Sequence, residues 1–305
     1  MALNYQELMA RSETDIPLSY SDSVTMLYAL CVGMGRDPLH RKELPYVYEQ
    51  GGAPSTVPTL ATVLVPDMFP KDLGWDYSQV LHSEQRMRLY RPLPAAADLL
   101  INKRVVDAFD RGSTRGALIL LEAEGRLASD DTVLFTLGCT IVARGDGGFG
   151  GPSGKGPAPH RAPRREPDLS CDLETRRDQA LLYRLNGDRN PLHADPGLAT
   201  RVGFPVPILH GLCTYGVACH AIGCGQRSRR VRALTSGTGV SIGLYPGRTS
   251  QSGRIGCRLQ LGARCNKIAQ VDRKGHQRDQ RDQQHDSKNS NRSPSLVVGV
   301  IGLTH

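Results

Sequence analysis

The chain of 305 residues lacks the patterns that mark metal-binding, redox and membrane proteins. Its eight cysteines include no C-x-x-C pair, and no set of His and Cys has the spacing of a zinc site. No apolar run is long enough to cross a bilayer, and the first residues, MALNYQELMARSETD, contain no apolar signal-peptide core. We therefore expect no metal and no membrane partner, and a reducing compartment. The expected location is the cytoplasm, with the peroxisome as the alternative.

Excess positive charge is absent from most of the chain. The formal net charge is +8, but residues 251–305 hold ten Lys and Arg against four acidic residues and so carry six of those charges. The body is therefore not expected to bind nucleic acid. Residues 251–305 are also largely polar and of low complexity, which predicts a basic tail without regular structure.

Residues 145–167 are dense in Gly, Pro and Arg. A Gly-rich stretch can cradle phosphate, but the strand and helix that would flank a P-loop are missing here. The composition instead predicts a linker. It separates an N-terminal domain at 1–144 from a C-terminal domain at 168–250.

Alternation and capping signals predict an α+β fold. A helix is expected first, capped by Ser21 or Ser23, and a second helix is expected after Thr175. The pair Asp195-Pro196 should start a short helix, and small residues in 210–224 should let a sheet pack closely around a buried helix there. The expected ranges are 21–35, 175–186 and 210–224 for the main helices, and 85–93, 102–112, 115–127 and 131–145 for antiparallel strands.

Two parts of the sequence resemble each other. The string LYAL…RDPLH at 27–40 matches LYRL…RNPLH at 182–193, and 57–61 similarly echoes 206–210. The shared order favours an old internal duplication. In the first copy Gly35 stands where the second has Asp188. We therefore interpret the first copy as catalytically inactive and His40 as structural.

The second copy gathers polar groups in a loop. Asp188, Asn190 and His193 lie within six residues, and Gly187 and Pro191 break regular structure there. A carboxylate and an imidazole that face one water form an acid/base pair. The alternative is a local turn, in which Asp188 or Asn190 bonds nearby backbone and His193 is half buried.

The longer string favours the first interpretation. Y-R-L-N-G-D-R-N-P-L-H-A-D-P, then G-F, then P-I-L-H-G-L-C-T-Y-G, closely resembles the hydratase motif of MaoC-like R-specific enoyl-CoA hydratases. This family includes the hydratase part of peroxisomal multifunctional proteins. Weaker resemblance covers roughly residues 5–225. It implies two tandem hot-dog domains, each a sheet wrapped around a long helix. Residues 226–305 do not supply a full set of strands, so the second domain is expected to be incomplete.

The resemblance also implies roles for residues. Asp188 and His193 would hold the water that adds to a trans-2-enoyl-CoA to give the (3R)-3-hydroxyacyl-CoA, with the choice of base left open. Asn190 would orient the pair or the water. The backbone N–H of Gly211, at a helix N-terminus, would stabilise the charge on the thioester oxygen. Glu49 would support the site or be an ordinary loop residue. No cofactor is implied beyond the CoA of the substrate.

Two other functions remain open from the sequence. If the second sheet is defective, the chain is a non-catalytic acyl-thioester-binding or scaffold subunit. If the reaction runs backwards, it is a 3-hydroxyacyl thioester dehydratase in a synthase pathway. In each reading the ligand is an acyl thioester. The degenerate N-terminal domain would hold the acyl chain, and the chain would form a homodimer or a heteromer.

Overall fold

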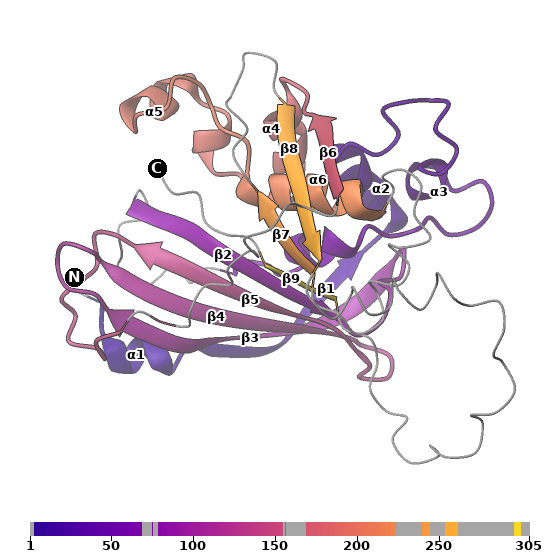
Figure 1. Ribbon diagram of the computed structural model, residues 1–305. Coiled ribbons are helices and arrows are strands. Elements are labelled where there is room, and N and C mark those ends of the chain that lie inside the picture. Colours follow the sequence, from indigo (N-terminus) through magenta and orange to yellow (C-terminus); the bar gives the residue numbers. More distant parts are fainter. Residues whose placement is uncertain are drawn as a thin grey trace, which may run out of the picture.

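The computed structural model describes residues 3–68, 75, 79–154, 156 and 169–223, and the backbone of three further strands at 240–244, 254–261 and 296–299 (Figure 1). Its strands form one nine-stranded sheet in the order β1-β3-β4-β5-β2-β9-β7-β8-β6. β9 joins the two halves, because it pairs antiparallel with β2 and parallel with β7. Within the described residues, no helix has both the length and the apolar character needed to cross a membrane.

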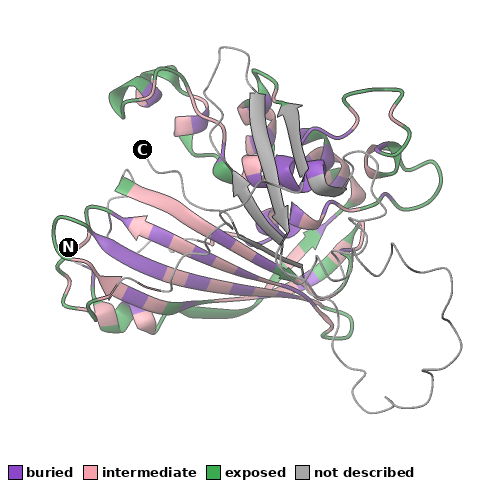
Figure 2. Cartoon of the chain, viewed as in Figure 1, coloured by how far each residue is buried: buried purple, intermediate pink, exposed green. Residues whose placement is uncertain are grey.

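The first half is an antiparallel sheet. Its strands are β1 (Ser12–Tyr20), β2 (Val80–Leu89), β3 (Ala97–Asp110), β4 (Ala117–Leu127) and β5 (Val133–Ala143). Along β5, Phe135, Leu137, Cys139 and Ile141 are buried while the residues between them are partly exposed (Figure 2). This alternation is what made β2 to β5 predictable. β1 was not predicted, because it is a largely exposed edge strand whose register shifts between residues 13 and 16.

The helices have the following bounds: α1 (Tyr5–Met9), α2 (Asp22–Cys31), α3 (Leu44–Val47), η1 (Pro58–Val63), α4 (Gln179–Tyr183), η3 (Arg184–Asn186), η4 (Pro191–His193), α5 (Pro196–Arg201) and α6 (Gly211–Gly223). α2, α4 and α6 lie over the inner face of that sheet, where their apolar side chains join one core with residues of β2, β3 and β5, whereas α1 packs on the opposite face with other residues of β3, β4 and β5 (Figure 1). α6 approaches α2 so closely that a Cβ on Gly216 would lie 2.4 Å from Val32 Cγ1. Gly216 therefore admits a helix on this face of α6, and the expected sheet contacts α6 as well, through β6 (Leu169–Glu174) and β8 (Arg254–Leu261).

The predicted helix boundaries need one correction. α4 begins at Gln179, so Thr175 does not cap it; Asp178 takes the N-cap position. The predicted stop at Gly187 is confirmed, since Gly187 ends η3 with φ 116°. The predicted start at Asp195 is also confirmed, because its carboxylate accepts the Gly197 N–H at 2.7 Å.

The start of the predicted linker belongs to the first half. The Asp110 carboxylate accepts N–H groups from Gly148 at 2.8 Å, Gly112 at 2.8 Å and Gly150 at 2.9 Å, and these bonds hold its pKa below the usual value. The Asp110 N–H also donates to the Pro152 carbonyl at 2.8 Å. The expectation of a flexible linker is therefore wrong for 145–154. Most of 155–167 lies outside the described residues.

The C-terminal strands correct a second expectation. β6 (Leu169–Glu174) pairs with β8 (Arg254–Leu261), and β8 pairs with β7 (Val240–Leu244). β9 (Leu296–Gly299) completes the sheet. Residues 251–305 were expected to lack regular structure, which is wrong for β8 and β9; residues 262–295 lie outside the described part. The predicted boundary at 250 falls between two hydrogen-bonded strands, and both β6 and β8 contact α6.

Candidate active site

The loop after η3 presents the predicted polar groups. Asp188 Oδ1 accepts the Asn190 N–H at 3.1 Å, and Asn190 Oδ1 accepts the Leu192 N–H at 2.9 Å. Two successive turns are thus closed by side-chain oxygens, and the second starts η4, which ends at His193. The local-turn interpretation and the catalytic interpretation are both compatible with this loop, since Asp188 keeps an exposed second oxygen.

His193 is held in one tautomer. Its side chain is almost buried, with 9% of the residue exposed, and Nδ1 lies 2.8 Å from the Ile208 carbonyl oxygen. A carbonyl only accepts hydrogen bonds, so Nδ1 carries the hydrogen of the neutral ring. The lone pair is then on Nε2, which can accept a proton.

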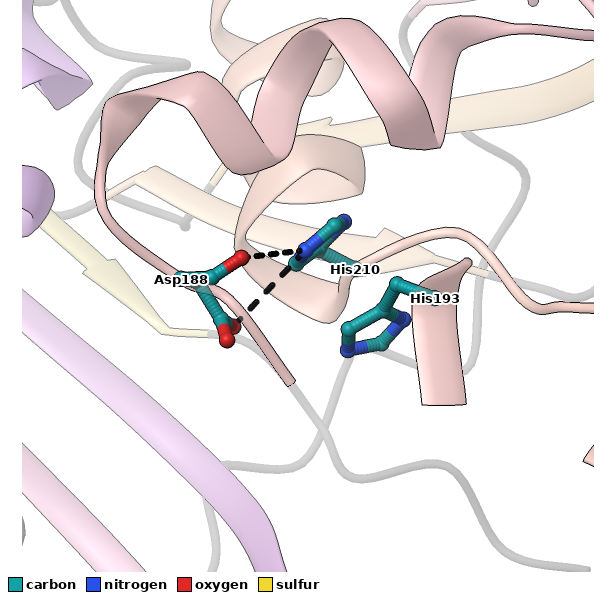
Figure 3. Close-up of side chains that lie close together, drawn as sticks. All are labelled: Asp188, His193 and His210. Carbon is teal, nitrogen blue, oxygen red and sulfur yellow. Dashed lines mark hydrogen bonds and ion pairs between the residues drawn. The ribbon is translucent and has the colours of Figure 1, made fainter. Parts of the chain in front are cut away.

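His210 lies against His193. The two ring centroids are 3.6 Å apart with planes 26° apart, and Tyr183 packs on His210 at 5.0 Å (Figure 3). The Nε2 of His210 donates to the Asp188 carbonyl oxygen at 3.3 Å and lies 3.9 Å from its Oδ2. Burial and the adjacent His193 lower the pKa of His210 to about 4. His210 is therefore neutral at pH 7.

These three residues could also be considered as metal ligands, because their ligand atoms all lie within 4.8 Å of one another. The ring geometry does not favour it. Lone pairs lie in the ring planes, so two stacked imidazoles direct them side by side rather than toward one point about 2 Å from each nitrogen. A water, which donates hydrogen bonds to acceptors about 3 Å away, fits this arrangement better.

The start of α6 adjoins this group. Gly211, directly after His210, is the first residue of α6 and is exposed. Backbone N–H groups in the first turn of a helix have no acceptor within the helix. The site therefore has a free donor next to its carboxylate and imidazoles.

The comparison with known families agrees with this arrangement. Residues 18–145 match the family described as the MFE-2 hydratase 2 N-terminal domain, and residues 158–225 match the MaoC like domain. The chain is also 40% identical over 227 residues to 3-hydroxyacyl-thioester dehydratase Y of Mycobacterium tuberculosis, which covers 73% of this chain and 76% of that protein. The chain belongs to the MaoC-like hydratase 2 family.

Other members support the family and the fold. The peroxisomal enoyl-CoA hydratase 2 of Arabidopsis thaliana is 35% identical over 237 residues, which is 72% of this chain and 76% of that one. A crystal structure of a MaoC-like dehydratase from Phytophthora capsici is similar with a TM-score of 0.60 at 29% identity, over 72% of this chain and 77% of that chain. The expected α+β fold of tandem hot dogs is thereby confirmed.

The hydrogen bonds at Glu49, within the described part of the chain, are local ones to its backbone. Glu49 lies in the exposed turn after α3, where its carbonyl oxygen accepts N–H groups from Gly51 and Gly52. Among the described residues, no hydrogen bond or ion pair links its side chain to Asp188 or His193.

Sequence reasoning missed two features of this site. The stacking of His210 on His193 joins residues 17 positions apart, and no periodicity signals it. The second is His82 on β2 of the first half. Burial lowers the pKa of His82, and the charge of Asp188 acts in the opposite direction. His82 lies before residues 85–93, where the strand was predicted, so no sequence pattern pointed to it.

Proposed function

We propose that this chain adds water to a trans-2-enoyl-CoA and forms the (3R)-3-hydroxyacyl-CoA. The observation that carries the proposal is the pairing of an exposed Asp188 carboxylate with the free Nε2 of His193 at the start of α6. Relatives named enoyl-CoA hydratase 2 support it. The (3R) configuration rests on the family to which the chain belongs.

In the proposed reaction, one water donates a hydrogen bond to the Asp188 carboxylate and one to His193 Nε2. As the water oxygen bonds to C3, one of these acceptors takes a proton and the other hydrogen stays on the new hydroxyl group. The C2=C3 electrons move toward the thioester oxygen, where the Gly211 N–H stabilises the charge. The removed proton then passes to C2 from the same side, so that one water is added in total. Asn190 orients Asp188 through its N–H.

This chemistry needs no metal or redox cofactor, because the thioester carbonyl already polarises C3. The same site can run backwards, and the dehydratase named among the relatives favours dehydration of a 3-hydroxyacyl thioester as the second candidate. The scaffold alternative assumed that the second sheet is missing. Because β6 and β8 lie beside α6, that assumption no longer supports it. We propose an acyl-CoA substrate, a homodimer or heteromer, and action in the cytoplasm or, as for the Arabidopsis relative, the peroxisome.

The test uses the purified full chain with trans-2-enoyl-CoA of short, medium and long acyl length. We expect loss of the enoyl absorbance and a product that separates as the (3R) isomer on a chiral column. A chelator should leave the rate unchanged, since no step needs a metal. Absence of hydration and dehydration at every chain length, in folded protein, would refute the proposal.

A further inference from the structure

The inactive copy of the motif contains a buried carboxylate that reaches into the other half. Glu43 is 8% exposed, and its Oε2 accepts the Gly35 N–H at 2.8 Å. Its Oε1 lies 2.7 Å from Nε2 of His220 on α6 and 3.0 Å from Nδ1 of His40. One side chain of the first half therefore binds both its own loop and the central helix of the second half.

His220 is bound on both sides. Its Nδ1 lies 3.1 Å from the Val32 carbonyl oxygen, and its Nε2 faces Glu43. Burial alone would raise the pKa of Glu43, but the hydrogen bonds from His220 and Gly35 outweigh it and leave that pKa below its usual value. Glu43 is thus ionised near neutral pH, and the contact is a charge-assisted hydrogen bond, the stronger and more directional kind.

α6 needs such a contact to fix its position along its own axis. Apolar packing is not directional, and the contact of Gly216 with Val32 leaves no side chain to interlock there. A further side-chain bond from α6 to the first half runs from Cys213 Sγ to the Cys31 carbonyl at 3.6 Å, and thiols are weak donors. The bond between His220 and Glu43, at 2.7 Å and to a carboxylate, is shorter and stronger than the bond from Cys213.

We propose that Glu43 and His220 are positioning residues of the hydratase site. Their bond fixes α6 lengthwise, and so fixes the N–H of Gly211 at the opposite end of the helix relative to Asp188 and His193. This inference rests on the proposed function. A helix rises 1.5 Å per residue, so the nine residues from Gly211 to His220 form a rod of about 13 Å that transmits a shift. Misplacing a catalytic group by about 1 Å can reduce the rate about 100-fold.

The test changes the length of the Glu43 side chain in one variant and its charge in another. Glu43→Asp draws the carboxylate back by one methylene, and Glu43→Gln removes the charge at nearly constant shape. We expect kcat to fall at least about tenfold with KM changed by less than about twofold, because the Gly211 N–H acts on charge that develops in the transition state.

A matched control makes the same change in an exposed pair. Glu122 lies 2.8 Å from Arg104 with both side chains largely exposed, so Glu122→Gln should leave kcat within error. Rates are expressed per folded molecule, from a denaturant titration at the assay temperature. If kcat per folded molecule stays within about twofold of the parent in both Glu43 variants, the pair only stabilises the fold and the proposal is wrong.

A second measurement does not depend on activity. Hydrogen exchange of the peptide covering 207–215 should be faster in Glu43→Asp than in the parent, and unchanged in Glu122→Gln. If the parent lacks hydratase activity, the proposed function fails, and exchange alone decides whether Glu43 positions α6. Should the Glu43 variants not fold, His220→Gln is measured in the same two ways, with the same outcomes expected and excluded.

Discussion

The two copies of the repeated motif fold alike and differ in what they present. Asp37 Oδ1 accepts the Leu39 N–H at 2.9 Å, and Asn190 Oδ1 accepts the Leu192 N–H at the same distance. The helices before both loops also pack together through equivalent tyrosines. The turn is therefore a structural device that both halves share, and it does not by itself make a site.

The histidines that end the two turns meet different surroundings. The His40 side chain is 37% exposed and contacts Glu43, whereas His193 is almost buried and stacks on His210. At the position of His210 the first copy has a buried Ala61. The comparison teaches that the chemistry depends on a few side chains around a common turn, which allowed one copy to take up a structural task.

The largest effect on the hydration rate is expected from substitutions of the polar residues in the second copy of the motif. Asp188→Asn and His193→Ala should each lower the hydration rate about 10²–10⁴-fold, because each removes one of the two groups that hold the water. Steady-state kinetics with circular dichroism as a folding control measures this. Near-parental rates in both variants would show that the site is elsewhere.

The next largest effect is on the pH dependence of stability, and it comes from His210, which has no titratable counterpart in the first copy. Its folded pKa of about 4 lies below the unfolded value of 6.5, so between these values the unfolded chain binds a proton that the folded chain does not. The free energy of unfolding should therefore fall as pH falls, by about 2 kcal/mol between pH 6.5 and 5.

Urea titrations of the parent and of His210→Gln check this, with the loss expected to be smaller in the variant. Keeping above pH 5 avoids the protonation of Glu43, whose lowered pKa places its own loss of stability below the usual carboxyl range. The lowered pKa of His82 acts in the same direction as that of His210 but is present in both proteins. Equal slopes would mean that His210 is charged in the folded chain.

The smallest effect is expected at His40. Its contact with Glu43 is partly exposed, and such polar contacts contribute little. His40→Ala should change kcat by less than about threefold. A loss as deep as that of His193→Ala, in folded protein, would show that the first copy also carries chemistry and would remove the contrast between the halves.

Much of this arrangement could be predicted from the sequence. The alternation along β2 to β5, the stop at Gly187 and the helix at Gly211–Gly223 follow from local patterns and were found. The loop of Asp188 and His193 was found because its residues are adjacent. The contacts of His210 with His193, and of Glu43 with His220, were not, since they join distant residues and depend on packing of the helices.

Asp110 has a consequence for any attempt to separate the halves. By accepting the Gly148 and Gly150 N–H groups, it ties the chain that leaves β5 back to the end of β3. A fragment that stops at residue 144 would keep this carboxylate but lose two of its donors, along with the backbone bond to Pro152. A gene cut for independent expression of the first half therefore belongs after residue 154, ten residues beyond the point that the composition suggests.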